Sequence, residues 1–180
     1  IFMKKAVIFD IDGVLAEKSP ERTFIEYDKV HLDKPIPQVF ELLDFYLREI
    51  DSEFNILFIT GRKELCREST VYFIMDNITY WKYPDRLPID LLEKYEYNDY
   101  EESGMYDLEP NPKLAVAKLF MRGDTDHRDG EVLKKEIYEN HIKGKYDIVA
   151  VYEDDPKICN MYKKEGLFVF QVGTRDDFCI

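Results

Sequence analysis

The chain has 180 residues, of which 45% are hydrophobic, so it is long enough to bury the core of a single domain. Its formal net charge of -12 argues against a broad surface that tracks phosphates, because non-specific nucleic-acid binding depends on Lys and Arg; an enzyme that acts on one phosphate at a chain end remains compatible. No apolar run is long enough for a membrane span, and three scattered cysteines fit reduced thiols in a cytoplasmic compartment better than a disulfide framework.

The first half of the chain alternates between predicted strands and predicted helices. The apolar, β-branched run at residues 5–11 predicts a short buried strand, which a polar loop follows. Residues 36–50 predict an amphipathic helix, residues 54–62 a second buried strand, and residues 64–78 a second helix. The apolar positions that share one face of the first helix are Val39, Leu42, Leu43, Tyr46, Leu47 and Ile50.

The second half continues this alternation after one irregular section. Residues 76–112 are rich in Tyr, Pro and acids, and we interpret them as an insertion within a single domain that spans residues 1–180. Residues 113–121 fit a helix or a strand, and we favour a strand at 118–121. A helix at 130–142 is expected to turn Val132, Leu133, Ile137 and Tyr138 inward. The remaining expected elements are a strand at 146–155, a helix at 156–166 and a strand at 167–172.

Polar residues stand at the ends of three of the predicted strands. Asp10 and Asp12 end the first, Thr60 the second, and Glu153 with Asp154 the strand at 146–155. Strands that alternate with helices predict an α/β fold, a Rossmann-like parallel sheet with helices on both faces. Ligands bind such sheets at the carboxyl ends of the strands, so we expect these polar groups to converge on one site.

The Asp10–Asp12 pair indicates a cation. Side chains at positions i and i+2 of a strand point the same way, and Gly13 permits a tight turn directly afterwards. Two carboxylates this close resist joint ionisation unless a cation lies between them, and Mg²⁺ accepts such a site. A calcium loop does not fit, because its glycine belongs at the sixth position; capping of a following helix is the alternative for isolated acids.

Four segments resemble, in the expected order, the motifs of the haloacid dehalogenase (HAD) superfamily of phosphatases. They are FDIDGVLA at 9–16, FITGR at 58–62, Lys134 as the third-motif lysine, and VYEDD at 151–155. Residues 22–42, 119–142 and 158–172 are further similar to the 3′-phosphatase domain of the phage-type polynucleotide kinase–phosphatases. The sequence contains no G-x-x-x-x-G-K-[ST] loop, so no P-loop kinase half is expected within it.

This resemblance implies a Mg²⁺-dependent phosphomonoesterase. Asp10 would form an aspartyl-phosphate, and Asp12 would protonate the leaving alkoxide and then activate water. The Asp10 side chain, the Asp12 backbone carbonyl and the Asp154 carboxylate would hold Mg²⁺, with Glu153 as a further candidate ligand. Lys134, preferred over its neighbour by its spacing from the motif arginine, would stabilise charge on the phosphate.

Five further residues are candidates for binding the substrate: Thr60, Gly61, Arg62, Arg22 and Arg128. Thr60 would donate a hydrogen bond to the phosphate, although it could instead cap a helix. The arginines match family arginines, but Arg62 could pair locally, and a surface role for Arg22 is about as well supported as a substrate role.

The similarity to 3′-phosphatases makes a 3′-phosphate of DNA, RNA or a nucleotide the expected substrate, with no membrane partner. Tyrosines and Trp81 of the insertion could stack on a terminal base, or simply pack the insertion. Two alternatives stay open. One is a phosphatase of small metabolites or mononucleotides; the other is a non-catalytic binding module, against which Asp10 and Asp12 argue.

Overall fold

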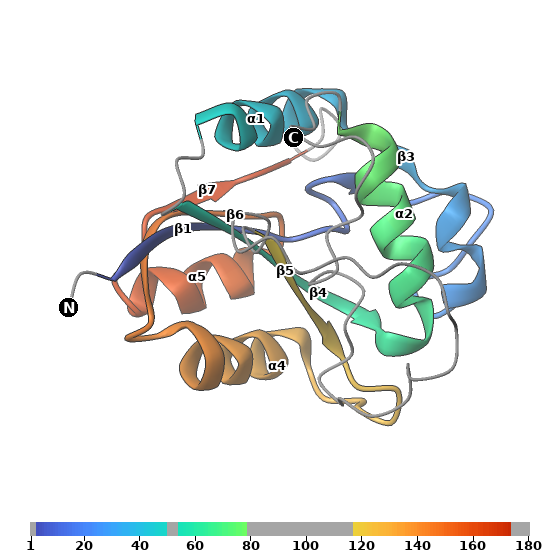
Figure 1. The fold of residues 1–180 in the computed structure, drawn as a ribbon. Coiled ribbons are helices and arrows are strands. Elements are labelled where there is room, and N and C mark those ends of the chain that lie inside the picture. The colour runs from blue at the N-terminus through green and yellow to red at the C-terminus, as the bar shows by residue number, and fades with distance from the viewer. Residues whose placement is uncertain (1–2, 50–53, 79–116, 174–180) are drawn as a thin grey trace, which may run out of the picture.

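A computed structural model describes residues 3–49, 54–78 and 117–173 of the protein. Its centre is a five-stranded sheet in the order β5-β4-β1-β6-β7, and every neighbouring pair of strands is parallel (Figure 1). The strands are β1 (Lys4–Phe9), β4 (Phe54–Lys63), β5 (Ala117–Arg122), β6 (Tyr146–Glu153) and β7 (Val169–Gln171). The predicted α/β fold is therefore confirmed.

Helices cover both faces of this sheet. They are α1 (Pro37–Glu49), α2 (Arg67–Asn77), α4 (Gly130–Ile137) and α5 (Pro156–Lys164). On β1, Val7 and Phe9 pack in one core with α1 and α2, whereas Ala6 and Ile8 pack in a second core with α4 and α5. Figure 1 shows the two pairs of helices on opposite sides of the sheet. Because successive side chains of a strand face opposite ways, β1 is apolar at every one of these positions.

Short elements complete the connections between the strands and helices. β2 (Ala16–Glu17) and β3 (Lys34–Pro35) pair antiparallel, and a 3₁₀ helix η1 (Tyr27–Leu32) lies between them. A 3₁₀ turn η2 (Glu64–Cys66) leads into α2, and a π-helical turn η3 (Tyr138–Ile142) follows α4. Within the described ranges, no helix combines the length and apolarity that crossing a membrane requires.

Most predicted elements are confirmed, including the strand favoured at 118–121. One predicted side-chain orientation is wrong. Val132 was expected to face inward but is 49% exposed, and Lys134 is buried instead. Successive helical residues are about 100° apart, so once Lys134 faces the sheet, Val132 lies about 200° around the helix and faces solvent. Of the predicted insertion at 76–112, Asp76 and Asn77 belong to α2 and Ile78 caps it, while residues 79–112, and also Ile50, lie outside the described residues.

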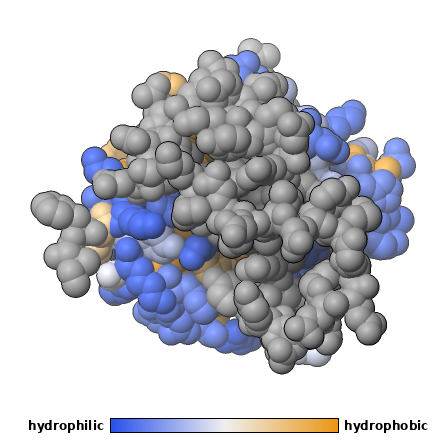
Figure 2. Space-filling view, in the orientation of Figure 1, coloured by the Kyte–Doolittle hydropathy of each residue, from blue (hydrophilic) through white to orange (hydrophobic). Residues whose placement is uncertain are grey.

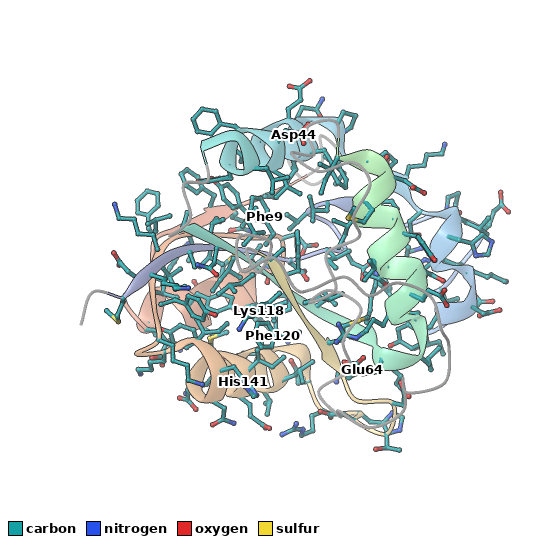
Figure 3. All side chains as sticks on the ribbon, in the orientation of Figure 1. Phe9, Asp44, Glu64, Lys118, Phe120 and His141 are labelled. Atoms are coloured by element: carbon teal, nitrogen blue, oxygen red, sulfur yellow. The ribbon has the colours of Figure 1, made fainter. Side chains whose placement is uncertain are left out.

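Side chains gather densely between the sheet and the helices (Figure 3). Phe9 stacks on Tyr152 of the neighbouring strand β6, with ring centroids 4.6 Å apart. On the other face, the ring centroids of Phe120 of β5 and His141 are 5.6 Å apart. Both residues are labelled in Figure 3. These contacts belong to the packed layers on the two faces of the sheet, and the polar residues lie at its carboxyl edge.

Candidate active site

The turn after β1 lies directly against Asp154, which follows the neighbouring strand β6. Gly13 has a φ of 80°, a conformation that residues with a Cβ rarely adopt. A Cβ on Gly13 would also lie 2.0 Å from Asp154 Oδ2. The absence of a side chain at this position therefore serves two purposes: it permits the turn, and it leaves room for the Asp154 carboxylate beside it.

Three carboxylates gather at this edge of the sheet. Oxygens of Asp10, Glu153 and Asp154 all lie within 4.8 Å of one another. The Lys134 ammonium, from α4, lies 2.9 Å from Asp10 Oδ1 and 2.7 Å from Glu153 Oε2. If all three carboxylates were ionised, the one positive charge of Lys134 would leave two negative charges in this mostly buried cluster, which is the charge that a divalent cation would balance.

Burial makes this cluster resist ionisation. Burial, together with the charge of Glu153, raises the pKa of Asp10 well above its usual range. Burial and the charge of Asp10 raise the pKa of Asp154 to about 6. Although burial by itself lowers the pKa of Lys134, the charges of Asp10 and Glu153 more than offset it, so Lys134 stays protonated.

The donor set fits a divalent metal ion. The buried Asp10 Oδ1 is close to Lys134 but has no hydrogen bond of acceptable geometry among the described residues. Such a buried oxygen needs a partner, and a metal ion would be one. Glu153 is already engaged, since it accepts from Lys134 and from the backbone N–H of Asp155. Asp10 and Asp154 are therefore the carboxylates with coordination capacity left.

Asp12 faces away from this cluster and towards two arginines. Its carboxylate accepts hydrogen bonds from Arg62 Nη2 at 2.7 Å, Arg62 Nε at 3.0 Å and Arg22 Nη2 at 3.0 Å. Both guanidinium groups also bind the buried carboxylate of Asp33, at 2.5 to 2.7 Å. Two guanidinium groups thus balance two carboxylates, and the network is close to neutral.

The arginines keep Asp12 ionised. Although burial favours the neutral form, hydrogen bonds and charge from Arg62 and then Arg22 hold the pKa of Asp12 below its usual value. Both arginine side chains are 1–2% exposed. The surface role considered for Arg22 therefore does not apply, and both side chains are directed to Asp12 and Asp33.

Asp33 is the member of this network that sequence reasoning missed. It follows η1 and precedes β3, so it does not stand at the end of a sheet strand, where we looked for polar groups. Its only sequence signal is its position inside the segment 22–42 that resembles the 3′-phosphatases.

The other candidate residues occupy different surroundings. Thr60 is fully buried inside β4 rather than at a helix cap, and its Oγ1 accepts from the Arg62 N–H at 3.2 Å. The Gly61 carbonyl accepts from Arg122 Nε at 3.0 Å. Arg128 lies apart from the cluster: its side chain is exposed and pairs with Asp126 and Glu136. Lys135, which follows Lys134 in the sequence, is also exposed, and its Nζ lies 3.9 Å from Glu139 Oε1.

The comparison with known protein families agrees with this geometry. The model for the family described as the polynucleotide kinase PNKP phosphatase domain matches residues 4–105 and 93–178 of the chain. The chain belongs to this family. It is accordingly a phosphatase of the HAD type, as the sequence motifs had indicated.

Individual relatives are more distant. The chain is 26% identical over 160 residues to an Autographa californica nuclear polyhedrosis virus protein named "Putative bifunctional polynucleotide kinase/RNA ligase"; the match covers 88% of this chain and 18% of that protein. In a solved structure of the Pnkp1/Rnl/Hen1 RNA repair complex, one chain has a TM-score of 0.68 at 21% identity, over 97% of this chain and 44% of that one. The match therefore spans less than half the length of each of these two relatives.

An acid phosphatase of known structure has a similar fold. The class C acid phosphatase of Bacillus anthracis, solved with tungstate bound, gives a TM-score of 0.51 at 11% identity, over 96% of this chain and 68% of that one. At such identities the likeness concerns the fold alone. The α/β architecture of that phosphatase is thus shared with this protein.

Proposed function

We propose that this chain is a Mg²⁺-dependent phosphomonoesterase that removes 3′-phosphates from nucleic-acid ends through a covalent intermediate on Asp10. The observation that carries the proposal is the arrangement around Asp10. Its carboxylate lies at the carboxyl end of the central strand, against Lys134 and Asp154, and the ionised Asp12 follows two residues later. This arrangement occurs in a member of the PNKP phosphatase family.

In the first step, a carboxylate oxygen of Asp10 attacks the phosphorus atom, and the bond from phosphorus to the 3′-oxygen breaks. Asp10 and Asp154 side chains, with the Asp12 backbone carbonyl, would hold Mg²⁺. When bound, Mg²⁺ would supply the positive charge that lets both carboxylates ionise and that reduces their repulsion of the phosphate. Lys134 keeps its proton and stabilises negative charge on the phosphate oxygens.

Asp12 moves the protons of both steps. It gives a proton to the departing 3′-oxygen and later takes one from the water that attacks the aspartyl-phosphate, which releases phosphate and restores the Asp10 carboxylate. Arg22 and Arg62 hold Asp12 in place and lower its pKa, which suits the second step. A bound phosphate adds negative charge nearby and raises that pKa, which favours the proton that the first step requires.

The arginines act mainly through Asp12 in this scheme. Their guanidinium groups already bind Asp12 and Asp33, so they offer the phosphate little uncompensated charge. Thr60, next to these groups in β4, remains the candidate donor to the phosphate. Lys134 is likewise paired with Asp10 and Glu153, so net attraction of a phosphate dianion to this site must come from a bound metal ion, which supports a metal-dependent reaction.

The substrate proposal is tested by comparing phosphoesters. We expect kcat/KM for a 3′-phosphorylated oligonucleotide to exceed that for a 5′-phosphorylated one and for sugar phosphates by at least about 10-fold, a difference of about 1.4 kcal/mol in transition-state binding. Asp10→Asn serves as the blank for contaminating phosphatase. Equal kcat/KM for the oligonucleotide and the sugar phosphates would replace this proposal with a phosphatase of small metabolites.

A further inference from the structure

The loop from Lys18 to Glu26 is anchored directly to the candidate active site. Arg22 Nη2 donates to Asp12 Oδ1 at 3.0 Å, and Nη1 of the same side chain donates to the Thr23 carbonyl at 3.1 Å. Ser19 N–H donates to Asp33 at 2.9 Å. The backbone that leads into Phe24 is therefore two hydrogen bonds from the Asp12 carboxylate.

This anchored loop presents an exposed aromatic ring. Phe24 is 67% exposed, although Ser19 and Arg22 in the same loop are buried. Figure 2 shows isolated hydrophobic atoms among hydrophilic ones at the edge of the molecule where η1 lies, next to this loop. The neighbouring Ile25 is 78% exposed as well, so this anchored loop presents a contiguous apolar surface beside the candidate active site, the kind of exposed patch that marks binding sites.

Lysine ammonium groups accompany the aromatic rings here. Lys18 Nζ lies 5.2 Å from the centroid of the Phe24 ring, and Lys63 Nζ lies 5.9 Å from that of Tyr27. Lys63 directly follows Arg62, which binds Asp12. Aromatic rings interleaved with basic groups are typical of surfaces that bind single-stranded nucleic acids, where bases stack on the rings and phosphates contact the cations.

One acid of this loop, Glu26, is already paired. Glu26 accepts from the Thr23 N–H at 2.7 Å and from Lys29 Nζ at 2.6 Å. Its negative charge is thus largely compensated within the loop and opposes an approaching phosphate backbone less than a free carboxylate would.

We propose that Phe24 stacks on the 3′-terminal base of the substrate strand and so positions the terminal phosphate at Asp10, an inference that rests on the proposed 3′-phosphatase function. Lys18 and Lys63 contact the preceding phosphates. Stacking is tolerant of base identity, because every base has a π-face, so Phe24 confers a preference for a nucleic-acid end over a small phosphoester without reading sequence. Phe24 is a positioning residue in this scheme, since it touches the base and not the reacting atoms.

The test is a double-mutant-type cycle that combines replacement of the Phe24 ring with removal of the terminal base of the substrate. Phe24→Ala, Phe24→Leu and Phe24→Tyr are compared with the unaltered protein on two 3′-phosphorylated oligonucleotides, one with a normal terminal base and one whose terminal nucleotide is abasic. Phe168→Ala is the matched control, because Phe168 is 65% exposed but precedes the amino end of β7, whereas the site lies at the carboxyl ends of the strands. Circular dichroism monitors folding.

With the normal base, Phe24→Ala and Phe24→Leu should lower kcat/KM by about 5- to 150-fold, which corresponds to the cost of losing one stacked base, whereas Phe24→Tyr and Phe168→Ala should retain it. With the abasic end, the unaltered protein should fall to the level of Phe24→Ala, and the substitution should have no further effect, because the two groups act only through each other.

A spectroscopic measurement gives an independent readout. A terminal 2-aminopurine should lose fluorescence on binding to an Asp10→Asn protein and should keep it when Phe24→Leu is added. Equal effects of Phe24→Ala on the normal and abasic substrates, or full activity of Phe24→Leu, would overturn the role of Phe24 while leaving a preference for 3′-phosphorylated ends intact. Absence of that preference in the unaltered protein would overturn both the inference and the function on which it rests.

Discussion

Asp10 carries the proposed chemistry, and its replacement gives the first prediction. Asp10→Asn removes the nucleophilic oxygen but keeps the shape of the side chain. We expect kcat to fall by about 10³-fold or more, the order of magnitude that loss of a catalytic group costs. Mg²⁺ affinity, measured by calorimetry, should fall as well. Asp147→Asn is the control, because Asp147 is exposed in β6 near its amino end, away from the cluster.

Lys134 and Lys135 form a natural pair for the second prediction. Lys134 is buried between Asp10 and Glu153, whereas the Lys135 side chain is 49% exposed. Lys134→Ala should lower kcat strongly and destabilise the fold by about 3–5 kcal/mol, because it leaves two buried carboxylates without their cation. Lys135→Ala should leave kcat nearly unchanged and should change the free energy of unfolding by no more than about 0.5 kcal/mol. Urea unfolding and steady-state kinetics separate the two, and a larger kinetic loss at Lys135 would contradict the assignment.

The sequence pointed to Asp10 and Asp12 as candidate site residues, but it did not indicate that their side chains have different partners. The D-x-D-G pattern indicates two carboxylates pointing into one crevice, yet Asp10 joins the acidic cluster and Asp12 joins the arginines. That separation depends on Arg22, Arg62 and Asp33, which come from three other segments of the chain. Spacing along β1 cannot reveal it, because the partners are brought together only by the fold.

At the scale of elements, helix α5 explains why three acids stand in a row after β6. Asp155 is the N-cap of α5, since its side chain accepts from the Lys157 N–H at 2.7 Å. Glu153 holds Lys134, and Asp154 lies against Gly13. The three adjacent carboxylates therefore serve a helix, a lysine and, as proposed, a metal ion.

The third prediction uses two of these neighbours. Asp155→Ala should destabilise the protein by about 1 kcal/mol, the usual cost of losing a helix N-cap, while Mg²⁺ affinity changes little. Asp154→Asn should weaken Mg²⁺ binding, because it removes a proposed metal ligand. It should not destabilise the metal-free protein, because it relieves the repulsion between Asp154 and Asp10. Thermal unfolding and Mg²⁺ titration of both variants provide the comparison. Loss of Mg²⁺ binding in Asp155→Ala alone would exclude this division of roles.

Helix boundaries and faces show where prediction from patterns works. The apolar spacing places Leu133 and Ile137 inward, as observed, because apolar periodicity reports burial in the core. The same pattern misplaces Val132, because it treats Lys134 as a solvated charge. Two carboxylates stabilise the buried Lys134 ammonium, so Lys134 shares the inward face of α4 with Leu133 and Ile137.

The molecule as a whole should couple its stability to pH and to Mg²⁺. The pKa of Asp154 is about 6 in the folded metal-free protein, above the usual value of 3.8, and that of Asp10 is also raised. For groups whose pKa is higher in the folded state, the stabilising contribution is full below the unfolded pKa and is lost as pH rises through the folded value. Metal-free protein should therefore lose stability between about pH 4 and pH 7 through these groups.

Mg²⁺ should counteract this loss, which is the fourth prediction. Metal ions bind the ionised carboxylates and compete with protons, so binding to the folded state stabilises it more at high pH than at low pH. The rise in Tm on adding 5–10 mM Mg²⁺ should be clear at about pH 7.5 and should nearly vanish at about pH 4.5, well below the pKa of Asp154. An equal rise in Tm at both pH values would indicate that Mg²⁺ does not bind at Asp10 and Asp154. The double variant Asp10→Asn with Asp154→Asn should show no rise at either pH.

By itself, the sequence determined the α/β class, the succession of strands and helices along the chain, and the polar residues that follow three of the strands. Those features follow from local periodicity, from turn chemistry at Gly13 and from polar residues at strand ends, all of which are properties of short segments. Only the tertiary structure decided which carboxylate pairs with which cation, that Asp33 completes the site, and that Phe24 stands exposed beside it. Such pairings depend on burial and on distances between segments far apart in the chain, since the charge state of a carboxylate is set by its neighbours in space.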